Sequence, residues 1–254
     1  GAVHVLFGQP GKGLSTTSVP DLLLHEDVQG AEDDVEGQDR FGWALAIGDF
    51  GVTAQEDLAV GVPGESAGFS RQGAVHVFYG GSYGPSGAND QVWHEGTAGV
   101  EGDPEVGDEF GRSLAVADFD AFSQADLAIG SPLEDVGSAP DAGAVHVIHG
   151  GPAGLSVSGS AAIPDQLWTR STTTLGASAT GDSFGFALAA GAFGNGPGAD
   201  LGIMAPGIAQ ADNGSVGAAH ILYGSDPTGL RTASAQLWHQ DSPGIEDQSE
   251  SGDR

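Results

Sequence analysis

Four short phrases recur in the same order along the 254-residue chain, and this internal repetition limits the fold more than any other feature. The phrase GAVHVLFG at Gly1 returns in related form at Gly73, Gly143 and Gly217, roughly 70 residues apart each time. The phrases DRFGWALAIGDF, DLAVGVP and QVWHE keep the same spacing between their copies, and DLLLHED at Asp21 is a weaker copy of the last. One structural unit is therefore repeated along the chain.

The phrases have the character of β-strands. Each contains about five to eight residues with small, β-branched or aromatic side chains, and clusters of Gly, Pro, Asp or Ser separate it from the next. Such runs are too short and too rich in glycine for amphipathic helices, which need an apolar stripe over ten or more positions. The sequence therefore predicts an all-β fold with four short strands in each unit.

A four-stranded antiparallel sheet cannot bury both of its faces by itself, but similar sheets placed side by side around a hub bury each other's faces. This arrangement is a β-propeller, in which each sheet is a blade. Small residues in the FGWALAIG phrase allow strands to crowd near the axis. The fourth strand carries one Trp in each unit, at Trp93, Trp168 and Trp238, which we interpret as a filler of the wider gaps between outer strands.

The pattern of Phe-Gly followed about twenty residues later by Gly-x-Pro resembles the FG-GAP repeat of integrin α-subunit propellers and their bacterial relatives. The copies are Phe41-Gly42 with Gly61-Val62-Pro63, Phe110-Gly111 with Gly130-Ser131-Pro132, and Phe184-Gly185 with Ala205-Pro206, where Met204 replaces the first Gly. The resemblance implies a seven-bladed propeller, an extracellular or cell-surface location, and a role in adhesion, ligand recognition or, in some members, lectin activity. Fold does not fix function, so these are expectations.

We treat residues 1–254 as one propeller region. Dividing it at each Phe-Gly gives an outer half-blade at 1–40 and blades at 41–109, 110–183 and 184–254. Three and a half blades do not close a ring. We therefore expect either further sequence beyond the termini, as in a seven-bladed ring, or an open arc that a partner or a second copy completes.

The charge of the chain limits its partners. Asp and Glu number 35 against 7 Lys and Arg, which gives a formal net charge of −28. Nucleic acid and anionic lipid would both repel such a surface, so we expect neither as a partner. No apolar stretch is long enough to span a bilayer, so we expect no membrane insertion. The absence of Cys leaves the redox compartment open, and the acidic balance suits a secreted protein.

The family resemblance implies Ca²⁺ binding by an Asp-x-Asp-x-Asp-Gly-x-x-Asp hairpin between the first two strands of a blade. The corresponding loops here have the right length but fewer acidic ligands. The candidate ligands are Asp49 and Asp57 in one loop, and Asp118, Asp120 and Asp126 in the next. The alternative is that the closing Asp of each loop only accepts hydrogen bonds from loop amides.

Acidic residues also fill the connections 25–40 and 94–109, which either recruit divalent ions or basic partners or are simply solvated. Four histidines occupy one place in the repeat, so each belongs to a different blade and they cannot converge on one ion; we expect them to be structural or exposed. They are His4, His76, His146 and His220.

No nucleophile elbow, zinc-protease or phosphate-loop motif interrupts the repeat, so we expect no catalytic residues in the chain. The leading hypothesis is an extracellular, non-enzymatic binding or adhesion propeller. Its ligand is a protein or a carbohydrate, held by the loops around Glu65, Asp135 and Asp212 and by those before each Phe-Gly. The alternatives are a self-assembling module of a fibre or surface layer, and a hydrolase whose catalytic residues lie outside this sequence.

Overall fold

The computed structural model describes residues 1–16, 20–28, 35–88, 90–158, 163–194, 196–210, 214–246 and 250. Every regular element among these residues is a β-strand, which confirms the predicted all-β class. None of them forms a helix that is long and apolar enough to cross a membrane. The chain is therefore built from strands and the turns between them.

Within the described residues, three four-stranded antiparallel sheets follow one another along the sequence. The first consists of β5 (Ala44–Gly48), β6 (Asp57–Val62), β7 (Ala74–Phe78) and β8 (Gln91–Trp93). The second consists of β9 (Ser113–Ala117), β10 (Asp126–Ser131), β11 (Ala144–Ile148) and β12 (Gln166–Thr169). The third consists of β13 (Ala187–Gly191), β14 (Asp200–Ala205), β17 (Ala218–Ser225) and β18 (Gly229–Trp238). These sheets are the four-stranded blades that the sequence predicts.

A two-stranded sheet precedes the three blades. It pairs β1 (Val3–Val5) with β4 (Leu22–Leu24), so that Val3 lies opposite Leu24. β1 comes from the same repeated phrase as β7 and β11, and β4 comes from the weaker copy of the fourth-strand phrase. The remaining described strands form two small hairpins. They are β2 (Phe7–Gln9) with β3 (Gly13–Ser15), and β15 (Ala209–Gln210) with β16 (Gly214–Ser215).

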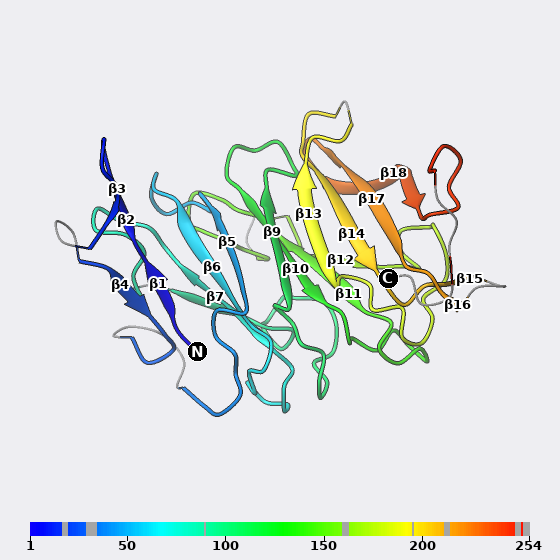
Figure 1. Ribbon diagram of the computed structural model, residues 1–254, viewed down its shortest axis with the longest axis horizontal. Coiled ribbons are helices and arrows are strands. Elements are labelled where there is room, and N and C mark those ends of the chain that lie inside the picture. Colours follow the sequence, from blue (N-terminus) through cyan, green and yellow to red (C-terminus); the bar gives the residue numbers. More distant parts are fainter. Residues whose placement is uncertain are drawn as a thin grey trace.

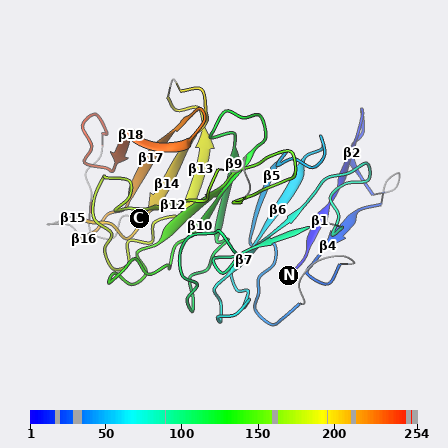
Figure 2. The same ribbon diagram turned by 180° about the vertical axis from the view of Figure 1, so that it is seen from behind.

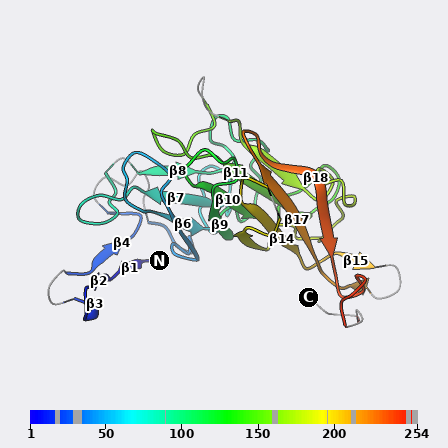
Figure 3. The same cartoon turned by 90° about the horizontal axis from the view of Figure 1, so that it is seen from above.

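The sheets lie side by side in sequence order and fan out as an open arc (Figures 1 and 2). Seen from above, the β1/β4 pair and the third sheet occupy the two ends of this arc (Figure 3). The first strands contact one another in succession, β5 with β9 and β9 with β13, so they form the hub. This is the arrangement of neighbouring propeller blades.

Apolar side chains fill the three junctions between successive sheets. Between the β1/β4 pair and the first sheet they include Leu24, Phe41 and Phe78. The next junction contains Trp93 and Phe110, and the last contains Trp168 and Phe184. Trp93 and Trp168 are thus buried fillers, as interpreted from the sequence, whereas Trp238 on the last sheet is 40% exposed. Burial of these apolar side chains against the neighbouring sheet stabilises each sheet.

At the two inner junctions, which lie between the first and second and between the second and third sheets, the structure explains why the first residue of Gly-x-Pro is glycine. A Cβ atom added at Gly61 would lie 2.1 Å from the carbonyl oxygen of Gly111, and one added at Gly130 would lie 2.2 Å from that of Gly185. Each Gly therefore lets a strand approach the Phe-Gly turn of the following sheet. Met204 stands at the equivalent place in the third sheet, which no further sheet follows among the described residues.

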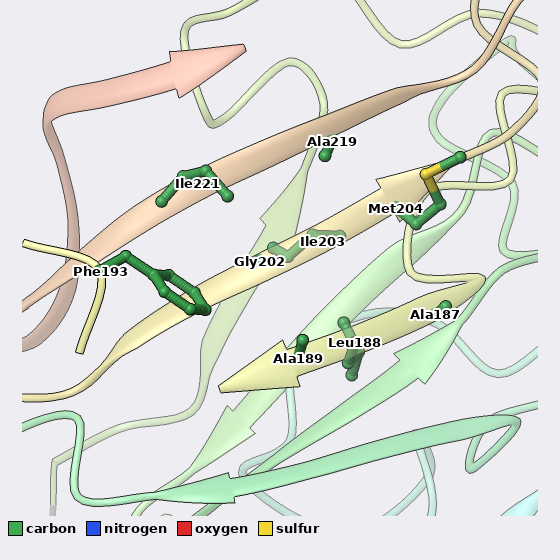
Figure 4. Close-up of a pocket in the computed structure, with 9 residues that line it drawn as sticks. All are labelled: Ala187, Leu188, Ala189, Phe193, Gly202, Ile203, Met204, Ala219 and Ile221. Atoms are coloured by element: carbon green, nitrogen blue, oxygen red, sulfur yellow. The ribbon is translucent and has the colours of Figure 1, made fainter. Parts of the chain in front are cut away.

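The outer face of the third sheet is uncovered. All residues of β6 and β10 are buried, whereas Gly202 and Met204 in β14 are only half-buried. A shallow apolar hollow of about 300 Å³ lies on this face, and Figure 4 shows Phe193 and Met204 at its opposite ends. The burial of β6 and β10 therefore depends on having sheets on both sides, which β14 lacks in this structure.

Candidate ligand-binding site

The Phe-Gly turn fixes the direction of the side chain that follows it. Gly42, Gly111 and Gly185 have φ values of 87°, 85° and 89°, which glycine adopts without steric cost. In each turn the residue after Gly donates its N–H to the carbonyl of the residue before Phe, as in the 3.0 Å bond from Trp43 to Arg40. The side chain after each Phe-Gly therefore occupies one equivalent place at the start of every first strand.

The residues at this place are Trp43, Arg112 and Phe186, one from each blade, and they stack in a row. The guanidinium carbon of Arg112 lies 5.1 Å from the ring centroid of Trp43 and 5.3 Å from that of Phe186. A guanidinium at this distance from an aromatic face is attracted by the ring quadrupole. We call these three residues the hub row.

The hub row is open to solvent, although it packs against itself. Trp43 is 51% exposed and Phe186 is 45% exposed. Leu45 and Ile47 continue the exposed apolar surface along β5. Contiguous exposed aromatic and aliphatic side chains are typical of surfaces that bind a ligand or another protein.

Positive charge gathers beside the hub row. Arg40, Arg71 and Arg112 all pair with the buried carboxylate of Glu109; for Arg40 the nitrogen-to-oxygen distance is 3.2 Å. Arg40 also lies over Trp43, at 5.4 Å from its ring centroid. Three guanidinium groups thus face one carboxylate, on a chain whose formal net charge is −28.

The predicted recognition loops contribute to this region in part. Arg40 and Glu109 end the two acidic connections, and Arg71 lies between the second and third strands of the first blade. Glu65 is buried and so does not present its carboxylate to a glycan or protein ligand at the surface, whereas Asp135 is exposed. Asp212 lies outside the described residues. The sequence analysis did not identify the hub row. A signal was present, because the position after Phe-Gly holds Trp, Arg or Phe while the residues around it are nearly the same in each copy.

The closing Asp of each candidate calcium loop accepts hydrogen bonds from backbone N–H groups. Asp57 accepts the N–H groups of Phe50 and Gly80 at 2.8 and 2.7 Å, and Asp126 makes the equivalent pair of bonds. Burial raises the pKa of Asp57 to about 6, in spite of these bonds. Asp49 accepts the N–H of Gly51 at 3.1 Å. Calcium binding by these residues stays a prediction.

The second loop brings two of its three candidate ligands together with a histidine. Nδ1 of His149 lies 3.4 Å from Asp120 and 3.3 Å from Asp126, and all three side chains are buried. Burial and the charge of Asp126 raise the pKa of Asp120 to about 6. Asp118 instead accepts N–H groups within the hairpin, from Phe122 at 3.0 Å and from Ser123.

The repeated histidines are structural in the three blades. His76, His146 and His220 are fully buried, and each packs against the Phe of the Phe-Gly turn in its own blade, with ring centroids 5.1 to 5.7 Å apart. Burial alone would lower the pKa of His146, but hydrogen bonds to Asp165 and Glu95 raise it to about 10. His4, in contrast, is exposed and lies 2.9 Å from Asp21.

The acidic connections are not uniformly solvated. Glu26 and Asp39 in the first, and Glu95 and Asp108 in the second, are between 0% and 3% exposed. They are buried because they lie at the junctions between sheets, where the chain passes from the last strand of one sheet to the Phe-Gly turn of the next. The sequence does not reveal this, because exposed acidic residues lie between the buried ones in each connection.

Comparison with known proteins supports the repeat assignment. Residues 110–148 match the FG-GAP repeat family. Phosphatidylinositol-glycan-specific phospholipase D of Rattus norvegicus is 33% identical over 170 residues, covering 65% of this chain and 20% of the relative. The Homo sapiens protein of that name is 32% identical over 153 residues, covering 60% of this chain and 17% of the relative. The chain thus spans a fifth or less of the length of these relatives.

Proposed function

We propose that this chain, which matches the FG-GAP repeat family at residues 110–148, is an extracellular, non-catalytic binding propeller for a carbohydrate that carries an anionic group. The observation that supports this most strongly is the hub row, in which the guanidinium of Arg112 lies between the exposed rings of Trp43 and Phe186. The proposed ligand contacts the aromatic rings with its sugar and the arginines with its anionic group.

The chemistry of the region favours this ligand class over a neutral or cationic one. Aromatic faces offer apolar contact area with little loss of conformational freedom, which suits the C–H faces of sugar rings. Guanidinium groups bind carboxylate, phosphate or sulfate through paired hydrogen bonds. Arg40 and Arg71 are exposed beside the row and held by Glu109, so they are positioned before a ligand arrives.

The name of the relatives supports the choice of this ligand class for the proposal. Their name refers to phosphatidylinositol-glycan, which combines a glycan with a phosphate-containing lipid. We propose that the present chain is a domain of a longer protein and supplies carbohydrate binding rather than catalysis. The strongly acidic surface elsewhere would confine an anionic ligand to the arginines, because it repels negative charge from most other faces.

Glycan-array binding followed by calorimetry tests the proposal. The chain should bind sulfated, phosphorylated or carboxylated glycans in preference to their neutral parents. Trp43→Ala or Arg112→Gln should weaken binding about tenfold or more, since each removes a contact of about 1–2 kcal/mol. Arg231→Ala and Tyr83→Ala, which change an exposed Arg and an exposed aromatic residue elsewhere, serve as controls. Equal affinity in all four variants would refute the hub row as the site.

The names of the relatives favour one other function, which is hydrolysis of a glycan-linked phosphatidylinositol by the protein to which this chain belongs. In that case the propeller would accompany a catalytic domain. Phosphodiesterase activity measured with the 254-residue chain tests whether catalysis resides in this sequence rather than in another domain. We expect no turnover from the chain itself, and turnover that survives Arg112→Gln would show that catalysis resides in this sequence.

The uncovered face of the third sheet favours a self-assembling role as a further alternative. Met204, Ile221 and Phe193 line an apolar hollow that a second copy would bury (Figure 4). Light scattering during size-exclusion chromatography tests it. A mass of one chain at all concentrations contradicts assembly, whereas a mass that grows with concentration and returns to one chain in Met204→Glu supports it.

A further inference from the structure

Three buried carboxylates meet at the junction between the first and second sheets. Glu95 follows β8 of the first sheet, Asp108 precedes the Phe-Gly turn of the second sheet, and Glu134 follows β10 of the second sheet. Their exposed fractions are 3%, 1% and 8%. One oxygen from each lies within 4.8 Å of the other two. The group therefore brings three carboxylates from two sheets together in one buried place.

Some carboxylate oxygens at this junction accept no hydrogen bond from the described residues. Oε1 of Glu95 accepts the hydroxyl of Ser131 at 2.9 Å and lies 3.2 Å from Nε2 of His146. Oε2 of Glu95 and Oε2 of Glu134 have no hydrogen-bond partner among the described residues. Buried carboxylate oxygens are rarely left without a partner, so these two oxygens indicate a ligand that the junction binds.

A single positive side chain does not balance the junction. His146 is held between Glu95 and Asp165, so its charge is opposed by two carboxylates before Asp108 and Glu134 are counted. The missing positive charge is therefore either protons or a bound cation.

The same group occurs one repeat earlier. Glu26, Asp39 and Glu65 are all buried at the junction between the β1/β4 pair and the first sheet, and their oxygens also lie within 4.8 Å of one another. Asp39 accepts a backbone N–H from three residues earlier at 2.6 Å, as Asp108 does. Two junctions thus have the same three carboxylates in the same places.

The third junction has the same frame but a built-in cation. Asp182 corresponds to Asp108, but Arg170 takes the place of Glu95 and pairs with Asp182 at 3.1 Å. Ile208 takes the place of Glu134. The backbone carbonyl of Glu134 accepts the N–H of Gly143 at 2.9 Å, and that of Ile208 accepts the N–H of Val216 at the same distance. Both donors lie just before the third strand of their sheet. Where both glutamates are lost, a guanidinium supplies the positive charge.

We propose that the three carboxylates of each of the first two junctions bind one Ca²⁺ ion, and that this cation links successive sheets. Ca²⁺ takes six to eight oxygen ligands at about 2.4 Å, so oxygens on opposite sides of one ion lie about 4.8 Å apart. The three carboxylate oxygens satisfy that limit, and the hydroxyl of Ser131 is a further oxygen beside the second group. The site is separate from the hairpin loops of Asp49 and Asp118.

The test is Ca²⁺ binding by calorimetry on the 254-residue chain after treatment with EDTA, together with thermal unfolding. We expect Ca²⁺ to raise the melting temperature. Glu95→Arg combined with Glu134→Ile reproduces the third junction, and this variant should stay folded in EDTA and bind one Ca²⁺ fewer than the parent chain. Glu134→Gln, which keeps the side-chain shape, should also lose one Ca²⁺ in case the double variant does not fold.

Two further variants separate this site from the hairpin loops and from protonation. Asp118→Asn combined with Asp120→Asn should leave the two junction sites intact. Arg170→Glu combined with Ile208→Glu should create one additional Ca²⁺ site. The proposal is overturned if the parent chain binds no divalent cation among Ca²⁺, Mg²⁺ and Mn²⁺ at neutral pH, or if the hairpin variant removes all binding while the Glu134→Gln variant binds as the parent does.

Discussion

Replacing Gly61 or Gly130 by alanine should destabilise the chain by forcing two sheets apart. Both glycines lie in extended strands, so alanine is compatible with their backbone conformation. The new methyl group would meet a carbonyl oxygen of the next sheet, at 2.1 Å for Gly61 and 2.2 Å for Gly130. An ordinary contact of this kind exceeds 3.4 Å. Because the obstacle is backbone, it cannot rotate away.

The expected cost follows from two opposing effects. Overpacking a well-filled interface costs about 1–3 kcal/mol, and the inner junctions are filled by fully buried side chains such as Phe110 and Phe184. Replacing Gly by Ala also restricts the unfolded chain, which returns about 0.4–1 kcal/mol. Since sheet separation loosens the whole junction, we expect a net loss of about 2 kcal/mol for either variant.

Urea unfolding followed by tryptophan fluorescence measures this loss, and Gly202→Ala is the matched control. Gly202 also lies in a second strand, but the nearest atoms to its added Cβ are 3.5 Å away, so we expect this variant to be as stable as the parent or slightly more stable. If Gly130→Ala unfolds at the same urea concentration as Gly202→Ala, the close approach of the sheets is incorrect.

Three other perturbations test the interior. Burial and Arg170 lower the pKa of His220 to about 4, so the unfolded chain binds the proton before the folded chain does as the pH falls below 6.5. The free energy of unfolding should therefore fall by up to about 3 kcal/mol by pH 4. Urea unfolding across this range should show a smaller loss for His220→Gln. Asp126→Ala leaves one buried and one half-buried N–H group unpaired and should cost about 3 kcal/mol in the same assay. Arg170→Ala leaves the carboxylate of Asp182 buried without its partner, and calorimetric unfolding should show a loss of about 3 kcal/mol at neutral pH.

The repeated phrases were sufficient to predict the strands because each phrase carries its own turn residues and its own buried face. Phe-Gly and Gly-x-Pro mark the start of the first strand and the end of the second, and the structure gives a reason for both: Gly111 adopts a positive φ, and Gly61 allows the next sheet to approach. The phrase containing His76 and His146 is equally regular because the histidine packs against the repeated Phe.

The candidate site was harder to predict because it depends on differences between copies. Trp43, Arg112 and Phe186 share one place in the repeat, but only the stacking of neighbouring blades brings them into contact. The buried carboxylates were hidden for a similar reason. Glu95 and Glu134 are 39 residues apart and belong to different sheets, so the sequence shows two ordinary acidic residues where the structure has one group.

A crystal structure of the chain with an anionic glycan selected on the array tests the proposed binding role most directly. The account predicts electron density for the sugar over Trp43 and Phe186, with the anionic group within hydrogen-bond distance of Arg40, Arg71 or Arg112. Density for the glycan at the outer strands or at the hollow beside Met204, with the hub row bare, would contradict it.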